Sequence, residues 1–131
     1  MGLKIALKPK ERVIIAGAAI VNGPSPATLL VENNVPVLRA KDILKEREAQ
    51  TPSQKIYFII QLMYLDPDNL PSHHKLYWQH VRSFLKAAPS ALGLIDAIST
   101  HILSANYYRA LKSARKLISY ETKLIAEAKV P

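Results

Sequence analysis

The sequence predicts an α+β fold, in which a small N-terminal antiparallel β-sheet of four or five short strands precedes a C-terminal bundle of four or five α-helices. Through residues 3–40, apolar and polar side chains alternate as they do in half-buried strands, and after residue 40 the apolar spacing becomes helical. The chain has 131 residues, 49% of them hydrophobic, which suits one domain or two small lobes. We therefore expect a β-sheet subdomain over residues 1–40 and a helical subdomain over residues 41–131, joined in one compact unit.

The first two strands are expected to pair as a hairpin. Residues 3–8 and 12–16 place their apolar side chains on a common face only if residues 9–11 form a three-residue loop. In this register Lys8 lies opposite Arg12 on the solvent side, and like charges in that position destabilise a sheet. The arrangement therefore calls for a counter-charge, which either the protein itself or an external polyanion could supply.

Three further extended segments complete the predicted sheet. A reversal at Ala16-Gly17 leads into "AAIVNG", and a cluster of turn-forming residues separates it from "ATLLVE" and "VPVLR". Pro36 should keep the last segment at a sheet edge, since proline cannot donate to the ladder. The expected inner face of the sheet consists of Leu3, Ile5, Leu7, Val13, Ile15 and Ile20.

The helical half contains several start and stop signals. Residues 41–49 read as a short charged helix. Thr51 is the expected N-cap of the next helix, with Pro52 at its first position and Gln54 closing a capping box. The helix that follows is apolar on nearly every side, so it should be the central buried one, and it should stop at Asp66.

Three more helices are expected to begin after Ser72, Ser90 and Asn106, with Pro89 ending the first of them. The connections are only a few residues long, so consecutive helices should pack antiparallel. The last helix carries an expected core stripe of Leu111, Ala114, Ile118 and Ile125.

The chain is strongly basic, with 18 Lys and Arg against 10 Asp and Glu and a formal net charge of +8. Such a field favours polyanionic partners, although a basic domain without a polyanionic partner remains an alternative. There is no cysteine, which excludes disulfides and thiolate chemistry. The most apolar window, residues 56–65, is about half the length needed to span a bilayer. Without a segment resembling a signal peptide, we expect a cytoplasmic protein that does not enter membranes.

No motif predicts catalysis. The glycines are too scattered to form a phosphate-binding loop, and no nucleophile lies beside a base. Asp66 and Asp68 flank a proline, as is usual in turns. We therefore expect no enzyme, no catalytic residue and no cofactor. We also expect no metal site, because metal-ligand spacing is missing from His73, His74, His80 and His101.

Two sets of basic residues are the candidate binding sites. A predicted RNA-binding set combines the hairpin with the junction between strand and helix: Lys4, Lys8, Lys10, Arg12, Arg39 and Lys41. A secondary basic patch follows one face of the last helix: Arg109, Lys112, Arg115 and Lys116. For this patch we favour a solvated face opposite the core stripe over a binding site. For the first set, Glu11 is the internal alternative to a phosphate backbone as counter-charge.

Four separated blocks resemble the FlbT family of flagellin regulators: "LKIALKPKERVIIAGAAIVNG", "LLVENNVPVLRAKDIL", "TPSQKIYFIIQLMYLDP" and "YYRALKSARKLISYE". The resemblance implies a cytoplasmic post-transcriptional regulator that binds the 5′ untranslated leader of flagellin mRNA. It also implies an effect on translation or stability of that mRNA, with FlaF as a companion protein. Three positions depart from the family pattern: Lys10 replaces a common turn glycine, Ala16 replaces an asparagine, and "GPSPATLL" replaces an arginine-rich stretch. The segments "ERVIIAG" and "NNVPVLRAKDI" are also loosely similar to the carbon storage regulator family. By analogy, this likeness implies RNA contact by Arg39, with the first strand beside it.

A protein-interaction module of flagellar assembly is the alternative function. In this interpretation the helical half binds flagellin or FlaF, and effects on mRNA are indirect. The contact surface would be apolar residues around Tyr107, Tyr108 and the last helix. An open sheet edge would also allow a homo-oligomer.

Overall fold

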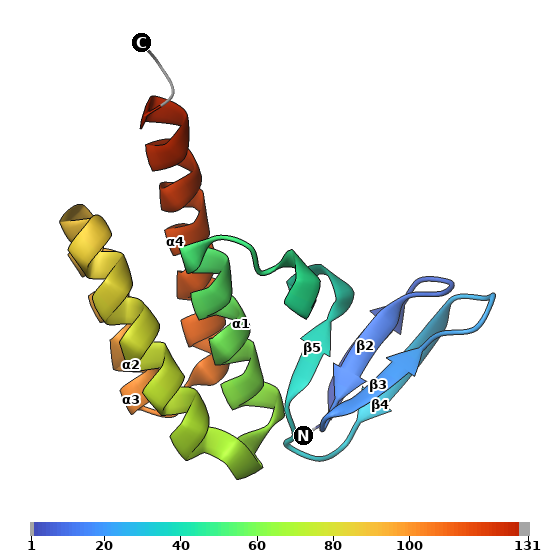
Figure 1. Ribbon diagram of the computed structural model, residues 1–131. Coiled ribbons are helices and arrows are strands. Elements are labelled where there is room, and N and C mark those ends of the chain that lie inside the picture. The colour runs from blue at the N-terminus through green and yellow to red at the C-terminus, as the bar shows by residue number, and fades with distance from the viewer. Residues whose placement is uncertain (1, 129–131) are drawn as a thin grey trace. The chain divides into compact units, whose positions relative to one another are not determined.

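The computed structural model describes residues 2–128, and the chain divides into two compact units between Ile43 and Leu44. The first unit holds five short strands and the second holds four α-helices (Figure 1). The predicted α+β class is therefore confirmed. That residues 1–40 and 41–131 act as subdomains of one compact unit stays a prediction. Within the described part of the chain, no helix is both long enough and apolar enough to cross a membrane.

The first unit consists of two antiparallel sheets rather than the single sheet expected. Its strands are β1 (Leu3–Leu7), β2 (Arg12–Ile15), β3 (Ala18–Val21), β4 (Ala27–Val31) and β5 (Val37–Arg39). β1 pairs with β4 alone, and β2 lies between β3 and β5. β5 is thus an edge strand, as the proline before it predicts.

The predicted hairpin between the first two strands is wrong. Leu7 pairs with Ala27 across the two-stranded sheet, and Arg12 pairs with Val21 across the three-stranded one. Consequently Lys8 does not face Arg12 across a ladder. The chain does reverse over residues 8–11, but the strands on either side of that turn enter different sheets.

The hydrophobic pattern is satisfied by packing between the two sheets instead of pairing within one sheet. The buried cluster of the unit draws on both sheets: Ile5, Leu7, Val13 and Val37. Two residues assigned to the inner face are exposed, since Leu3 is 52% exposed and Ile20 is 37% exposed. Leu3 lies at the end of its short ladder and Ile20 on edge strand β3, so neither is covered within this unit.

The second unit is a helical bundle built from α1 (Pro52–Leu65), α2 (Leu70–Ala87), α3 (Leu92–Leu103) and α4 (Tyr107–Ala128). The predicted capping box of α1 is present, with Thr51 and Gln54 side chains and backbones bonded reciprocally. α1 packs against both α2 and α4 and buries residues around its circumference: Ser53, Ile56, Tyr57, Ile59, Ile60, Gln61 and Met63.

The helix predicted over residues 41–49 is wrong. Two short 3₁₀ turns, Ala40–Asp42 and Glu46–Glu48, occupy this segment. Between them the Gln61 side chain accepts from the Leu44 N–H at 2.8 Å and donates to the Leu44 carbonyl at 2.9 Å. Because Gln61 occupies both backbone groups, the helical hydrogen-bond ladder does not continue through Leu44.

The start predicted for α2 is also displaced, since the helix begins at Leu70 rather than after Ser72. Pro71 lies within its first turn, where a missing N–H has no consequence. Asn106 does precede α4 and accepts from the Arg109 N–H at 3.3 Å, as an N-cap does.

Candidate nucleic-acid interface

Three exposed cations lie between the end of β1 and the start of β2. Lys8 and Lys10 lie in the reversal, and Arg12 is the first residue of β2. We call these three residues the cationic turn. The reversal is closed by the Glu11 N–H, which donates to the Lys8 carbonyl at 3.1 Å. Lys10 has a φ of 62°, a left-handed conformation that glycine adopts more readily than lysine.

A second loop fixes the backbone of the cationic turn. The Asn22 side-chain amide donates to the Lys8 carbonyl and to the Ser25 carbonyl, each at 2.9 Å. The Lys10 N–H in turn donates to the Gly23 carbonyl at 3.0 Å. The loop after β3 therefore holds the turn after β1. This role of Asn22 is not evident from the sequence, where its position before glycine and proline indicates only a turn.

Glu11 does not neutralise the cationic turn. One carboxylate oxygen accepts from the Lys8 backbone N–H at 2.8 Å, and the other lies 3.7 Å from an Arg39 guanidinium nitrogen. Across residues 2–128, no carboxylate forms an ion pair with the side chains of the cationic turn. The internal counter-charge considered for this set is thus directed to Arg39 instead.

Arg39 has partners within the first unit. It pairs with Val13 at the end of β5, and its guanidinium donates to the Ala6 carbonyl on β1 at 2.5 Å. Together with the Glu11 contact, this bond joins the two sheets. The side chain remains 41% exposed, so part of the guanidinium is still available to solvent.

The other two members of the predicted RNA-binding set are exposed at separate points. Lys4 lies on β1 opposite Leu30. Lys41 lies in the 3₁₀ turn that follows β5. Three members of the set thus lie within five consecutive residues at the reversal, and Arg39 contacts Glu11 of the same segment.

The secondary basic patch is exposed along α4, and two of its members contact tyrosine rings. The Lys112 ammonium lies 5.0 Å from the centroid of the Tyr108 ring, and the Arg115 guanidinium lies 5.6 Å from that of Tyr57. Such cation–π contacts position the charge without neutralising it. The core stripe predicted on the other face is partly wrong, because Ile125 is 42% exposed.

His73 is buried and contacts a carboxylate. Its Nε2 lies 3.1 Å from an Asp66 carboxylate oxygen, to which the Asn69 amide also donates at 2.9 Å. These hydrogen bonds, that from Asn69 first, lower the pKa of Asp66. In the region that the structure describes, no three or more His, Cys, Asp or Glu side chains are placed to hold a metal ion.

The chain is similar to proteins of a known family. Residues 3–125 match the model of a protein family described as flagellar protein FlbT. No solved structure matches the chain.

Among related proteins, the probable flagellum biosynthesis repressor protein FlbT 1 of Bradyrhizobium diazoefficiens is 46% identical over 95% of this chain and 85% of its own length. The corresponding Rhodopseudomonas palustris protein is 40% identical over 96% of this chain and 99% of its own length. The flagellum biosynthesis repressor protein FlbT of Caulobacter vibrioides is 37% identical over 92% of this chain and 87% of its own length. The chain therefore belongs to the FlbT family of flagellum biosynthesis repressors, which are regulators and not enzymes.

Proposed function

We propose that this protein is a cytoplasmic post-transcriptional regulator that binds the untranslated leader of flagellin mRNA and alters its translation or stability. The observation that carries the proposal is the cationic turn, whose three exposed side chains have no acidic partner among the residues described and whose backbone is fixed by Asn22. The chain has a net charge of +8 and belongs to a family of repressors. Its positive field attracts polyanions such as mRNA.

The phosphate backbone is the partner that this turn fits best. Lysine and arginine side chains neutralise phosphates and release condensed counterions, which gives affinity without sequence information. Sequence choice would come from unpaired bases in the leader, because RNA is read mainly where its bases are unstacked. Occupying the leader blocks ribosome access or changes exposure to nucleases, so regulation needs no catalytic group on the protein.

The remaining basic residues extend this surface in the proposal. Lys4, Arg39 and Lys41 contribute from the same unit, with Arg39 also supporting the junction between its two sheets. The secondary basic patch on α4 supplies further phosphate contacts from the helical unit: Arg109, Lys112, Arg115 and Lys116.

The test is a binding titration of the purified protein against a flagellin leader RNA over a series of salt concentrations. The double variant Lys8→Glu with Arg12→Glu should weaken binding by more than tenfold. It should also flatten the dependence of log affinity on log salt by about 1.4, since each phosphate contact to a single strand contributes about 0.7.

A matched control is Lys75→Glu with Arg82→Glu, which makes the same charge change at exposed positions of α2. It should lose much less affinity than the double variant of the cationic turn. Unchanged affinity of Lys8→Glu with Arg12→Glu at moderate salt would contradict the proposal. Equal losses in both double variants would show that only net charge matters.

The second candidate is a protein-interaction module that binds flagellin or FlaF. The exposed apolar side chains on α4 favour it, since Tyr108 is 40% exposed and Ile125 is 42% exposed. Salt separates the two candidates, because an apolar helix contact loses much less affinity with rising salt than phosphate contacts do. A homo-oligomer through edge strand β3 is a further proposal, tested by sedimentation.

A further inference from the structure

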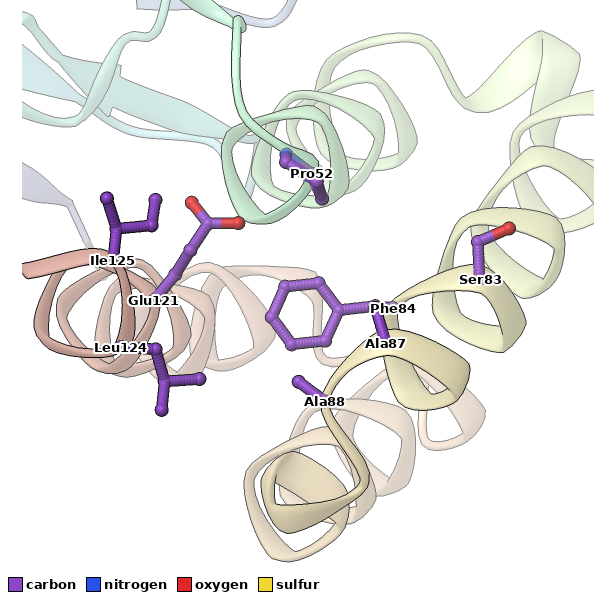
Figure 2. Close-up of a pocket in the computed structure, with 8 residues that line it drawn as sticks. All are labelled: Pro52, Ser83, Phe84, Ala87, Ala88, Glu121, Leu124 and Ile125. Carbon is purple, nitrogen blue, oxygen red and sulfur yellow. The ribbon is translucent and has the colours of Figure 1, made fainter. Parts of the chain in front are cut away.

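A groove of about 360 Å³ in the helical unit lies between the start of α1, the end of α2 and the later turns of α4 (Figure 2). Its lining is apolar apart from Ser83 and Glu121. Both carboxylate oxygens of Glu121 accept hydrogen bonds from Ser53, one from its N–H at 2.9 Å and one from its hydroxyl at 2.5 Å. The lining of this groove therefore identifies neither an occupant nor a reaction.

The loop after β3, in the first unit, does carry a defined reaction. Asn22 is followed by Gly23, whereas none of the other four asparagines of the chain precedes a glycine. The side-chain carboxamide of an asparagine can be attacked by the backbone nitrogen of the next residue, which closes a five-membered succinimide ring. Glycine permits this attack best, because it has no Cβ to crowd the nitrogen. Asn22–Gly23 is therefore the place in the chain where loss of a side-chain amide is most favoured.

The reacting groups of this dipeptide already lie together. The Gly23 N–H donates to Oδ1 of Asn22 at 2.8 Å, so the nitrogen that must attack is directed at the side-chain carboxamide. Gly23 is exposed and Asn22 is half-buried, so water reaches the dipeptide. Holding reacting atoms in contact accelerates a reaction, because they do not have to meet by diffusion.

The surroundings stabilise the charges that develop during the reaction. The Asn22 amide nitrogen, which leaves as ammonia, donates to the Lys8 and Ser25 carbonyls, each at 2.9 Å. These carbonyl dipoles favour positive charge on the leaving nitrogen. The dipeptide also adjoins the cationic turn, since the Lys10 N–H donates to the Gly23 carbonyl at 3.0 Å. A positive field favours a deprotonated Gly23 nitrogen and a negative oxygen on Asn22.

We propose that Asn22–Gly23 is a site of self-modification that converts Asn22 to aspartate or isoaspartate and thereby releases the cationic turn. First, the Gly23 nitrogen loses its proton to water and bonds to Cγ of Asn22. The Cγ–Nδ2 bond then breaks, and Nδ2 takes up a proton and leaves as ammonia. Finally, water adds to one of the two ring carbonyls and breaks the bond from that carbon to the ring nitrogen. One water is consumed and one ammonia is released, with no oxidation or reduction.

Either product removes the contacts that fix the cationic turn. A carboxylate has no N–H, so its oxygens would face the Lys8 and Ser25 carbonyls, and acceptors repel one another. Isoaspartate also lengthens the main chain by one carbon at Asn22, whose N–H donates to the Glu11 carbonyl at 2.9 Å. The new negative charge adjoins three cations that the proposed function assigns to phosphate binding. Loss of RNA affinity therefore rests on the proposed function, whereas the modification itself does not.

Mass spectrometry of the folded, full-length protein measures the modification directly. During incubation at neutral pH, the peptide that contains Asn22 should gain the mass difference between a carboxylic acid and an amide, and an isoaspartate-specific methyltransferase should label it. Peptides with the other asparagines are internal controls and should stay unmodified: Asn33, Asn34, Asn69 and Asn106. Conversion of Asn22 only in protein kept unfolded in urea would show that the fold prevents the reaction, and would overturn the proposal.

Gly23→Ala is the matched variant. A Cβ added at Gly23 meets no atom within 4 Å, and the backbone there is not left-handed, so the variant should fold like the wild type. Its methyl group crowds the attacking nitrogen, so conversion of Asn22 should slow by about tenfold. Equal rates in the two proteins would exclude ring closure through the Gly23 nitrogen.

Asn22→Asp reproduces one product and tests its effect on the cationic turn. Amide hydrogen exchange at Lys10, whose N–H is bonded to the Gly23 carbonyl, should be faster in this variant than in the wild type. Asn34→Asp makes the same charge change at an exposed position after β4 and should leave the exchange unchanged. Equal exchange in Asn22→Asp and wild type would show that the turn is not released.

Titration with leader RNA completes the test. Asn22→Asp should bind about tenfold more weakly than the wild type, and its log affinity should depend less on log salt by about 0.7, as for one lost phosphate contact. Asn34→Asp should lose much less affinity. Unchanged binding by Asn22→Asp, where Lys8→Glu with Arg12→Glu does weaken binding, would contradict the inferred loss of RNA affinity. If neither variant changes binding, the proposed function fails, while mass spectrometry and hydrogen exchange still decide the modification and the release of the turn.

Discussion

Glu121 on α4 caps the N-terminus of α1 through Ser53, a residue 68 positions earlier in the chain. Ser53 lies in the first turn of α1, where backbone N–H groups have no acceptor within the helix. Both residues are buried, so water does not supply an acceptor there. The negative charge at this end of the helix is also favourable to the helix dipole.

Removing this cap should destabilise the helical unit. We expect Glu121→Ala to lower the free energy of unfolding by about 2–4 kcal/mol, because it leaves a buried N–H and hydroxyl without their charged acceptor. Ser53→Ala removes only the hydroxyl bond and should lower it by about half as much. Urea unfolding of the three proteins measures this difference. A loss below about 0.5 kcal/mol for Glu121→Ala would show that the cap contributes little.

The turn between β2 and β3 should be open to stabilisation. Ala16 has a φ of 51° and Gly17 a φ of 84°, so both central residues of this two-residue turn are left-handed. Alanine is poorly suited to that conformation, whereas asparagine tolerates it. Ala16→Asn should raise the free energy of unfolding by about 1 kcal/mol. Ala19→Asn, on the extended backbone of β3, is the control and should not stabilise.

Asp66 should make stability depend on pH in acid. Its pKa is lowered below the ordinary 3.8 by hydrogen bonds from Asn69 and His73. A lowered pKa means that the folded protein binds this proton less readily than the unfolded chain. The stabilisation is therefore fully present above the unfolded value and is lost as pH falls through the folded one.

Asp66→Asn should remove that part of the pH dependence. The difference in unfolding free energy between wild type and variant should shrink as pH is lowered from 6 through about 4 and below. Urea unfolding at each pH gives the profile. Asp68→Asn makes the same charge change at an exposed neighbouring position and should preserve the wild-type profile. Parallel curves for wild type and Asp66→Asn would contradict the assignment.

The ion pair between Arg39 and Glu11 should be weak, and the bond from Arg39 to the Ala6 carbonyl should matter more. A double-mutant cycle with Arg39→Ala and Glu11→Ala should give a coupling of less than about 1 kcal/mol, since the arginine side chain is 41% exposed. Arg39→Ala alone should exceed that value, because it also removes the bond between the two sheets. A coupling energy larger than the loss of unfolding free energy in Arg39→Ala would reverse this ranking.

Local signals in the sequence predict the helical unit well. The capping boxes and prolines act within a few residues, so Thr51 and Asn106 are recognisable without knowledge of tertiary structure. The helix predicted over residues 41–49 does not form, because the side chain of Gln61, distant in sequence, hydrogen-bonds to the backbone of Leu44. A helical charge pattern cannot reveal such competition.

Strand pairing and the site are less predictable for a similar reason. Alternation shows which side chains share a face, but it does not show whether two strands lie in one sheet or in two stacked sheets. Residue type correctly places cations near the first turn, whereas the partners of Glu11 and Arg39 depend on the sheet arrangement. The helical spacing of Ile125 predicts a core residue. Only the structure shows that the other helices of the bundle leave it exposed.

The bonds from Asn22 across two loops have a consequence for the energetics of complex formation. A flexible loop loses conformational entropy when it is immobilised on a partner, and this loss subtracts from affinity. Here the main chain beneath Lys8 and Lys10 is already fixed in the free protein. Only side-chain rotamers remain to be ordered, so in the proposed complex with RNA the folding of the nucleic acid, not adaptation of the protein, should set the rate and selectivity of binding.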